Sequence, residues 1–493
     1  MTRATALLLI AGALLAPGLL IGPGLDAAVF SQVGSRLLDG AVPYVGAWDH
    51  KPPGIYLADA GAQAVLGWLG AWTADWLVTL VATAGIGVAV AVALARLGVT
   101  GWPRWLAAGG AVAFAAQYLV ALGGGLTEAP AAVLAGAALA LGLSGGRRWQ
   151  PLVVGVLFGL AIIFSVQAVP AVIALVILLR ASPKGLSLVG IGVALPLGLV
   201  VGWLALVGAL PAALDALIGY TAAYRASNAG YGGTLSGPLI SWTVLASLAL
   251  IAPAILGAPY AWAAAGPRRT AAAAALGWAA LAMALFAIQG RFLAHYVIPL
   301  AVPLGVLSGL GLERLAASLD LRRKAVDRAV LILPLALTLA ISIAAGAIAG
   351  SMEAAPLAAN SQRLQTVATY LRDSGREAGT MLVWGNQPRL YDLARRAPAT
   401  RFSYFYPLTT PGYTTQALID DVARQLVEHP PQFVVDAGSD APGEPGFLPL
   451  IVPRPVATDG RDLDLLAPLR DFVRARYDLA GVVAGWPVYT LRR

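Results

Sequence analysis

The segment Leu25–Ala60 carries the side chains best suited to chemistry, because acids, bases and turn-forming residues stand there between two apolar stretches. His50 and Lys51 lie side by side in it and are followed by Pro52 and Pro53. The whole chain has three histidines and three lysines, so this pairing indicates a functional site. A lysine ammonium binds phosphate as a compact charge, and a nearby carboxylate accepts protons.

Other ionisable and polar side chains fall at the ends of apolar stretches rather than within them. Those predicted to lie on the same side as Lys51 are Asp26, Asp49, His50, Glu128, Gln167, Arg225, Arg291 and His295. Ionisable groups beside hydrocarbon are costly and tend to mark sites or pathways. A cluster with both signs of charge therefore indicates an anionic ligand handled beside a carboxylate.

Composition identifies the medium in which these residues work. Of the 493 residues, 58% are hydrophobic and 12% are charged, whereas about 25% are charged in a typical soluble domain. This balance predicts a polytopic membrane protein. The absence of cysteine excludes disulfides, thiolate metal sites and a cysteine nucleophile. Most arginines sit in short loops rather than on one soluble face, so no nucleic-acid partner is expected.

Apolar stretches predict about eleven transmembrane helices, some short enough to need tilt or local thinning of the bilayer. They lie at residues 4–22, 75–95, 105–122, 129–143, 151–166, 169–180, 186–207, 238–258, 270–288, 293–311 and 328–350. Arginine and lysine concentrate in alternate connections, which the positive-inside rule makes cytoplasmic. In a plasma membrane, the N-terminus is then cytoplasmic and the loop 24–74 lies outside.

A rival interpretation makes residues 1–22 a cleaved signal peptide, since Arg3 precedes an apolar run. The run ends at Gly22-Pro23-Gly24 without a clear small-x-small cleavage site. Asp26 also fits the loop that would follow a first membrane span, which is the interpretation we favour.

After residue 351 the composition changes, and residues 352–493 predict an extracytoplasmic α/β domain. The predicted helices cover residues 360–373, 414–428 and 463–475. The predicted strands cover residues 380–385, 401–406, 432–438, 479–485 and 487–491. The chain thus divides into a transmembrane domain at 1–351 and a second domain at 352–493, whose strand order the sequence does not reveal.

Several of these residues together resemble a known class of membrane enzyme. Asp26 is followed by the run LLDGAVPYVGAWDHKPPGIY, and later come Thr127-Glu128, Arg291 and His295-Tyr296 with Pro299. This pattern is similar to the glycosyltransferases of the GT-C class, in particular the bacterial family related to protein O-mannosyltransferases and to the aminoarabinose transferases that modify lipid A. The C-terminal string LVWGNQPRLYDLARR also resembles the tails of bacterial members.

The resemblance implies a GT-C fold and transfer of a sugar, with inversion, from a polyprenyl-phosphate donor to a lipid, glycan or protein acceptor outside the membrane. It implies no cofactor and no metal. Asp26 would be the general base or the carboxylate that orients the acceptor. The predicted donor-phosphate ligands are Lys51, Arg291, His295 and Arg225. The predicted sugar or acceptor ligands are His50, Glu128, Gln167, Tyr224 and Tyr296.

Each candidate also has an ordinary structural interpretation. Asp26 suits a helix N-cap, Lys51 a snorkelling interfacial side chain, and Glu128 a helix N-terminus. His50 either holds a sugar hydroxyl or satisfies the turn. Members of the resembling family often carry a lysine after the stretch GLAIIF, where this chain has Ser165-Val166-Gln167. Without that lysine, Lys51, Arg291 and Arg225 would have to neutralise the phosphate.

Two later pairs of residues have the same double interpretation. Arg291 and His295 stand four residues apart, on one face of a helix, and would clamp phosphate together. Taken singly, Arg291 suits an interfacial anchor and His295 a core histidine. Tyr224 and Arg225 belong to a Gly- and Asn-containing loop that either covers the site or forms turns.

Two other classes of function compete with the enzyme. A secondary transporter or lipid flippase also has many spans and a charged cavity, but it predicts ionisable residues near mid-span and paired repeats. In this sequence the charges gather at the outer ends of the spans. The third class is a catalytically silent scaffold whose outer domain binds a cell-wall polymer, and a sugar-transfer assay separates it from the enzyme.

Overall fold

The computed structural model describes residues 2–144, 148–178, 183–227, 238–263, 266–289, 293–318, 358–374, 379–439 and 464–492, with a few single residues between these ranges. Two features predicted from the sequence lie outside this part of the chain. Arg291 is one of them. The other is the predicted span 328–350, apart from three single residues.

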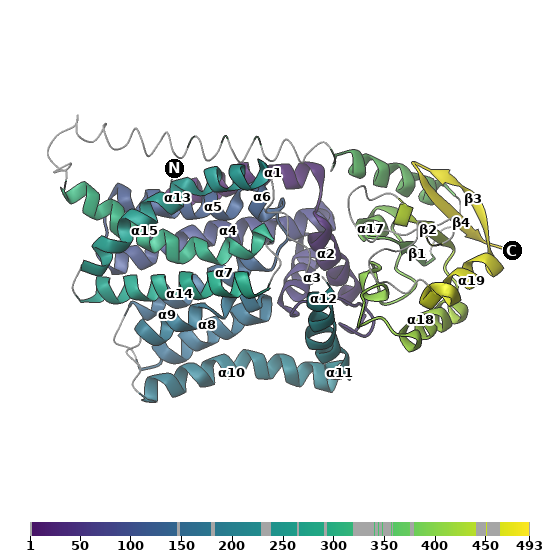
Figure 1. Cartoon of the computed structure of the whole chain (residues 1–493), viewed down its shortest axis with the longest axis horizontal. Helices are drawn as coiled ribbons and strands as arrows, with labels where there is room; N and C mark the ends of the chain where they lie inside the picture. Colours follow the sequence, from purple (N-terminus) through teal and green to yellow (C-terminus); the bar gives the residue numbers. More distant parts are fainter. Residues whose placement is uncertain are drawn as a thin grey trace.

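A bundle of apolar helices forms the larger part of the molecule (Figure 1). Its helices are α1 Arg3–Ile21, α4 Ala71–Arg96, α5 Trp102–Ala116, α7 Glu128–Gly142, α8 Gln150–Phe164, α9 Ala171–Leu178, α10 Pro183–Leu206, α13 Pro238–Ala263, α14 Pro267–Gln289 and α15 Ala301–Ser318. Each apolar stretch predicted up to residue 311 contains one of these helices. Five helical segments in the described part are long and apolar enough to cross a membrane, and the molecule is a multi-pass membrane protein.

Small residues let the helices of the bundle approach closely. A Cβ on Gly155 of α8 would lie 2.3 Å from the carbonyl oxygen of Val189 on α10, and a Cβ on Gly311 of α15 would lie 2.3 Å from Cα of Gly257 on α13. Both distances are too short for any side chain larger than hydrogen. Packing of this kind replaces the hydrophobic effect as the force between helices in lipid.

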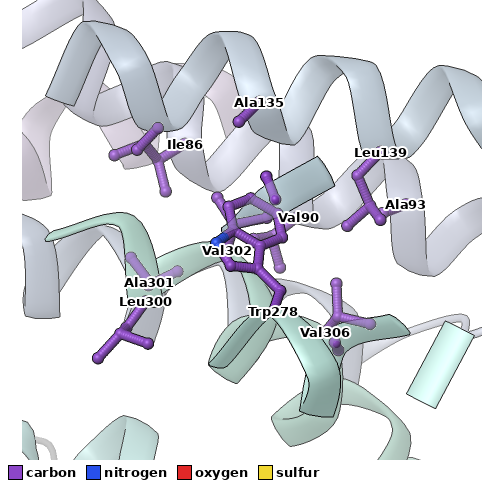
Figure 2. Packing of buried hydrophobic residues seen from close by; sticks show 14 of the residues in the cluster. Ile86, Val90, Ala93, Ala135, Leu139, Trp278, Leu300, Ala301, Val302 and Val306 are labelled. Atoms are coloured by element: carbon purple, nitrogen blue, oxygen red, sulfur yellow. The ribbon is translucent and has the colours of Figure 1, made fainter. Parts of the chain in front are cut away.

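Large buried side chains fill the space that remains between the helices. Trp278 of α14 is fully buried and lies among Val90 of α4, Ala135 of α7 and Val302 of α15 (Figure 2). These four helices therefore form a fixed frame for the segments at their ends.

Two of the predicted spans are interrupted rather than continuous. Gln117 leaves the helical conformation between α5 and the short α6 (Tyr118–Ala121). A 3₁₀ segment, η4 (Ala294–Leu300), precedes α15 and contains Pro299, which has no N–H to donate to a helix. The prediction of continuous helices over 105–122 and 293–311 is wrong at these points. Between α8 and α9, Ser165 is extended and η2 (Val166–Ala168) follows, close to the predicted boundary between the spans 151–166 and 169–180.

Short segments lie between the bundle and the C-terminal domain (Figure 1). They are α2 Leu25–Leu38, α3 Gly54–Leu66, α11 Leu210–Leu214, η3 Asp215–Tyr220 and α12 Thr221–Ser227. The 3₁₀ turn η1 (Gly67–Leu69) leads from α3 into α4. The predicted loop 24–74 is therefore mostly helical, and the non-helical stretch that carries His50 and Lys51 connects α2 to α3.

The C-terminal α/β domain contains a four-stranded sheet of order β1-β2-β4-β3. Strands β1 (Met381–Trp384) and β2 (Phe433–Asp436) are parallel, whereas β4 (Trp486–Leu491) runs antiparallel to both β2 and β3 (Tyr477–Val483). The helices of the domain are the segment 358–373, α17 Arg389–Ala394, α18 Gln416–Glu428 and α19 Ala467–Arg476, with 3₁₀ turns η5 Tyr406–Leu408, η6 Ala437–Ser439 and η7 Asp464–Leu466.

Four of the five predicted strands are confirmed, and the one predicted at 401–406 is wrong. That segment consists of bends that lead into η5, although its aromatic residues alternate as in a strand. The side chains of Phe402, Tyr404 and Phe405 are buried because they pack against partners outside any sheet. The short helix α17 was not predicted.

Candidate active site

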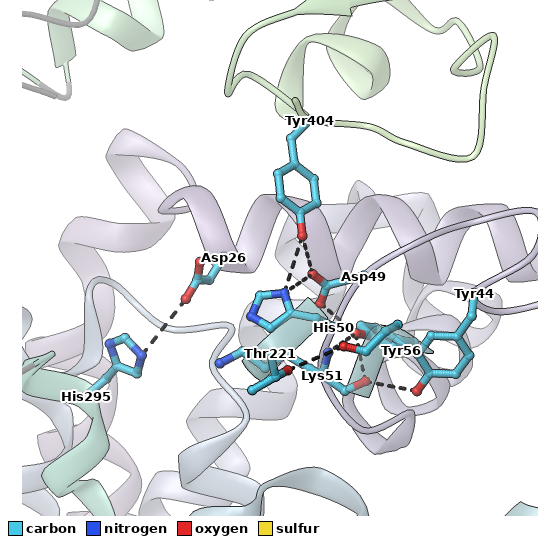
Figure 3. Close-up of polar contacts among 10 residues, drawn as sticks. Asp26, Tyr44, Asp49, His50, Lys51, Tyr56, Thr221, His295 and Tyr404 are labelled. Atoms are coloured by element: carbon cyan, nitrogen blue, oxygen red, sulfur yellow. Dashed lines mark hydrogen bonds and ion pairs between the residues drawn. The ribbon is translucent and has the colours of Figure 1, made fainter. Parts of the chain in front are cut away.

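Asp26 and His295 face each other across the end of the bundle (Figure 3). Nε2 of His295 lies 3.9 Å from Oδ2 of Asp26. The side chain of Asp26 is 39% exposed and that of His295 is 4% exposed, so the carboxylate is the accessible member of the pair. The N-cap of α2 is Gly24, and Asp26 lies in the first helical turn. The N-cap interpretation of Asp26 is therefore wrong.

Lys51 lies in the same cluster of residues. Its ammonium nitrogen is 5.5 Å from the ring centroid of Tyr296, and the ring of Tyr296 meets that of His295 edge to face, with 4.6 Å between centroids. Burial by itself lowers the pKa of Lys51, but Tyr296 and the charges of Asp26 and Glu128 raise that pKa above its ordinary value. Lys51 therefore remains a cation next to these groups.

Glu128 and Gln167 reach the cluster from the bundle. Glu128 is the first residue of α7 and is almost fully buried. Gln167 lies in η2 and is also buried. Both α7 and η2 pack against η4, the segment of His295. The start of α7 therefore places the carboxylate of Glu128 near Lys51, and η2 places Gln167 against the segment that carries His295.

Tyr224 and Arg225 occupy different positions, although they are adjacent in the sequence. The ring of Tyr224 lies 5.6 Å from that of His50 and stacks on Tyr220 at 5.3 Å. Arg225 is exposed and donates a hydrogen bond to the carbonyl oxygen of Ile288, near the end of α14. The structure thus brings Tyr224 to His50, whereas the backbone of α14 engages Arg225.

Asp49 is the residue of this region to which the sequence assigned no role. Its carboxylate accepts hydrogen bonds from the hydroxyls of Tyr56, at 2.6 Å, and Tyr404, at 2.7 Å. Nδ1 of His50 lies 3.1 Å from Oδ1 of Asp49. Its position beside His50 in the sequence was the only available signal, because Tyr404 comes from the C-terminal domain.

The donors around Asp49 determine its charge. Burial by itself raises the pKa of Asp49, but the attraction of His50 and the hydrogen bonds from His50 and the two tyrosines hold it well below its ordinary value. Burial, reinforced by the charge of Asp49, raises the pKa of Tyr56 and of Tyr404 well above the ordinary range. Asp49 is therefore a carboxylate that accepts hydrogen bonds from two neutral hydroxyls.

A second polar cluster lies behind the site, between α2, α3 and α4. The amide nitrogen of Gln63 donates to both oxygens of Asp75, at 3.1 and 2.9 Å, and to the carbonyl oxygen of Ser31. Burial, and then the charge of Asp75, raise the pKa of Asp59 well above its ordinary value. These contacts join α2, which carries Asp26, to α3, which directly follows the loop of Lys51.

Among the residues that the structure describes, no group of three or more histidine, aspartate and glutamate side chains lies close enough to hold a metal ion. Asp26 and Glu128 instead share Lys51 as their nearby cation. The chemistry that these residues offer is proton transfer by a carboxylate and binding of an anion by an ammonium.

No protein-family model and no curated protein matches the sequence. The fold, by contrast, is similar to solved structures. ArnT from Cupriavidus metallidurans bound to undecaprenyl phosphate gives a TM-score of 0.57 at 16% identity, over 99% of this chain and 97% of that chain. The apo state of the same protein gives 0.56 at 16% identity, over 99% and 98%.

A second protein with a similar fold is the oligosaccharyltransferase of Archaeoglobus fulgidus, tethered with an acceptor peptide that contains the NVT sequon. Its TM-score is 0.51 at 13% identity, over 88% of this chain and 68% of that chain. ArnT, an aminoarabinose transferase, and this oligosaccharyltransferase are both of the GT-C class. The chain therefore has the GT-C fold, a polytopic helical membrane bundle followed by a C-terminal α/β domain.

Proposed function

We propose that the protein is an inverting glycosyltransferase that moves a sugar from a polyprenyl-phosphate donor to an acceptor at the outer face of the membrane. The observation that carries this proposal is the cluster of an accessible carboxylate, Asp26, with the half-buried cation Lys51 and with His295. Transfer from a lipid phosphate needs a base for the acceptor and a cation for the leaving group.

In the proposed reaction, Asp26 takes the proton of the acceptor hydroxyl as the oxygen attacks the anomeric carbon. The bond between that carbon and the phosphate oxygen breaks, and its electron pair remains on the phosphate. The ammonium of Lys51 stabilises the negative charge that develops there, because preorganised cations act most strongly on a developing charge in a water-poor site. Attack from the face opposite the leaving phosphate inverts the anomeric centre.

The neighbouring residues have supporting roles in this proposal. His295 and Tyr296 line the phosphate side together with Lys51, while Glu128 and Gln167 contact the sugar. His50 and Tyr224 offer an imidazole and an aromatic face to the sugar or the acceptor. The predicted roles of Arg225 and Arg291 as phosphate ligands remain predictions.

Two features support the lipid donor and the outer face. ArnT, whose fold is similar, was solved with undecaprenyl phosphate bound. The arginine-rich connections, such as those of Arg96 and Arg104, lie at the opposite end of α4 and α5 from the site, which supports an outer position of the site by the positive-inside rule. We therefore propose that the protein lies in the plasma membrane, with its N-terminus in the cytoplasm and the domain 352–493 outside.

A transporter or flippase is the alternative function. It would use ionisable groups near the middle of the spans and paired half-helices. The acidic and basic residues of the site instead gather where α2, α3, α7 and η4 meet at one end of the bundle. Turnover of the donor separates the two functions, because a transporter leaves the sugar–phosphate bond intact.

The direct test measures sugar release by the purified protein in proteoliposomes. The donors are radiolabelled pentoses and hexoses linked to undecaprenyl phosphate, and the acceptors are extracted envelope lipids and glycans. We expect Asp26→Asn to lower kcat by about 10²- to 10⁴-fold, the usual contribution of a general base. Asp39→Asn changes an exposed acid of the same loop that pairs with Arg36, and it should retain the parent rate.

Two outcomes would contradict the proposal at different levels. A parent rate in Asp26→Asn would remove Asp26 as the base while leaving the transferase in place. Intact donors in every reaction, together with their movement across the bilayer, would replace the transferase by the flippase.

A further inference from the structure

Asp49 connects three parts of the molecule through one carboxylate (Figure 3). Tyr56 lies on α3, His50 lies in the loop before α3, and Tyr404 belongs to the C-terminal domain, 355 residues away in the sequence. The side chain of Asp49 is 2% exposed. A buried carboxylate with three partners is expensive to disturb, because each lost partner leaves desolvated charge unpaired.

Tyr56 connects Asp49 to the backbone of Lys51. The Tyr56 hydroxyl donates to Oδ2 of Asp49 and accepts from the backbone N–H of Lys51 at 3.1 Å. The hydroxyl of Tyr44 donates to the carbonyl oxygen of the same residue at 2.9 Å. Hydrogen bonds therefore fix both backbone polar groups of Lys51. Because the main chain is fixed, the position in which the ammonium can bind the phosphate is restricted.

Tyr404 connects Asp49 to the imidazole of His50. Nδ1 of His50 lies 3.1 Å from Asp49 and 3.4 Å from the Tyr404 hydroxyl. A carboxylate at Nδ1 keeps the proton on that nitrogen and fixes the ring. Nε2 is then the atom through which His50 meets a ligand. The ring also packs on Tyr220, with 5.1 Å between centroids.

The C-terminal domain holds this loop at a second point. The backbone N–H of Trp48 donates to the carbonyl oxygen of Arg401 at 2.8 Å. The ring of Trp48 packs against Phe402 at 5.4 Å and Tyr404 at 6.0 Å. Residues 401–404 thus contact the residues immediately before Lys51 through backbone, ring and hydroxyl.

We propose that Asp49, Tyr56 and Tyr404 are positioning residues of the active site, so that the C-terminal domain supplies part of the machinery that orients His50. The inference rests on the proposed transferase function and deepens it. Asp49 and Tyr56 fix the donor side of the site through Lys51, whereas Asp49 and Tyr404 fix the acceptor side through His50. The C-terminal domain therefore contributes to catalysis by orienting a residue of the active site.

The test compares two tyrosines of the C-terminal domain that each donate across to the membrane domain. Tyr404→Phe removes the hydroxyl from Asp49 and keeps the ring. Tyr413→Phe removes a hydroxyl that donates to Asp215 at 2.6 Å and also hydrogen-bonds with Trp48, so it weakens the docking of the domain without touching Asp49. We expect Tyr404→Phe to lower kcat about 10-fold, the scale of one charge-assisted hydrogen bond, with an unchanged Kd for undecaprenyl phosphate. Tyr413→Phe should change neither quantity.

Tyr56→Phe tests the donor side, and here the affinity for the lipid phosphate is expected to change rather than kcat alone. It removes the hydroxyl that holds the main chain of Lys51, so the Kd for undecaprenyl phosphate should rise about 10-fold. A double-mutant cycle tests the route through His50. In a His50→Gln background, Tyr404→Phe should lose most of its effect on kcat, because the group that it positions is already gone.

The outcomes separate the inference from the proposed function. Parent kinetics in Tyr404→Phe would overturn the inference and leave the transferase intact. Equal losses of thermal stability and rate in Tyr404→Phe and Tyr413→Phe would reduce Tyr404 to a docking contact and also overturn it. Absence of sugar release by the parent protein would overturn the proposed function, and the inference with it.

Discussion

At the scale of single residues, the site depends on one ammonium placed among acids. Lys51 lies near Asp26, Glu128 and the ring of Tyr296. Its positive charge compensates the two carboxylates, and an incoming phosphate competes with them for the same charge. The residue is therefore both a structural counterion and the proposed phosphate ligand.

Lys51→Gln removes this charge and leaves a polar, uncharged side chain that is one atom shorter. We expect the Kd for undecaprenyl phosphate to rise about 10- to 100-fold, the range for a hydrogen bond to a charged group. Lys184→Gln makes the same change at the exposed start of α10 and should leave the Kd unaltered. Equal affinities of the two variants in tryptophan-quenching titrations would show that Lys51 does not hold the phosphate.

Sequence reasoning located the charged residues well and their partners poorly. Asp26, Lys51, Glu128 and His295 were predicted to converge, and the structure brings them together. Their short distances follow from the ends of spans meeting on one side of a bilayer. The bond between Asp49 and Tyr404 could not be predicted, because it joins residues 355 apart and depends on how two domains dock.

At the scale of elements, the turn after Lys51 is fixed by contact with the bundle. Helix α3 begins at Gly54, directly after Pro52 and Pro53. A Cβ on Gly54 would lie 2.7 Å from the carbonyl oxygen of Ile163, in the last turn of α8. Two prolines limit the backbone of the turn, and the glycine lets it approach α8.

Gly54→Ala should therefore disturb the site through the backbone. The added methyl group meets a backbone carbonyl that has little freedom to move, so we expect a loss of about 1–3 kcal/mol in stability and a lower transfer rate. Gly61→Ala lies on the same helix with open space around its Cβ, and it should be neutral or stabilising by up to about 1 kcal/mol. Melting temperatures in detergent and transfer rates for both variants check this. Similar behaviour of the two variants would contradict the close-contact explanation.

Apolar length predicted the helices of the bundle, and alternation predicted most of the strands. The failures have physical causes. Residues 401–406 alternate like a strand because Phe402 and Tyr404 face the aromatic cluster around Trp48. The breaks after α5 and before α15 occur in apolar sequence, where hydropathy does not distinguish a helix from an interrupted one.

At the scale of the whole molecule, the C-terminal domain is attached to the bundle by several polar contacts. Arg389 of α17 donates to the carbonyl oxygen of Ile21, at the end of α1, at 3.1 Å. Tyr404 and Tyr413 donate to Asp49 and Asp215 across the same interface. These hydrogen bonds hold the domain over the site, whereas the charges of Asp392 on α17 and Asp75 on α4 repel each other.

The raised pKa of Asp392 predicts a pH dependence of stability. Although the side chain is exposed, desolvation by the surrounding protein, and then the charge of Asp75, raise its pKa to about 7, against the opposing effect of Arg389. An acid whose pKa is higher in the folded protein, against about 3.9 unfolded, binds more protons when folded. Its contribution to stability therefore falls as the pH rises from about 4 to about 7.

Asp392→Asn should accordingly raise the melting temperature more at pH 8 than at pH 5, because the parent is already protonated at pH 5. The measurement is differential scanning fluorimetry in one detergent at both values. Asp373→Asn, an exposed aspartate on the helix 358–373, serves as the control and should show no such difference. A gain for Asp392→Asn that is equal at both pH values would contradict the raised pKa of Asp392.

The most direct test of the central claim is a structure of the protein with undecaprenyl phosphate bound. The account predicts the phosphate within hydrogen-bond distance of the Lys51 ammonium, about 2.7–2.9 Å, with His295 beside it and the Asp26 carboxylate facing the side where the sugar is attached. A phosphate bound elsewhere, while the Lys51 ammonium stays among Asp26, Glu128 and Tyr296, would contradict it.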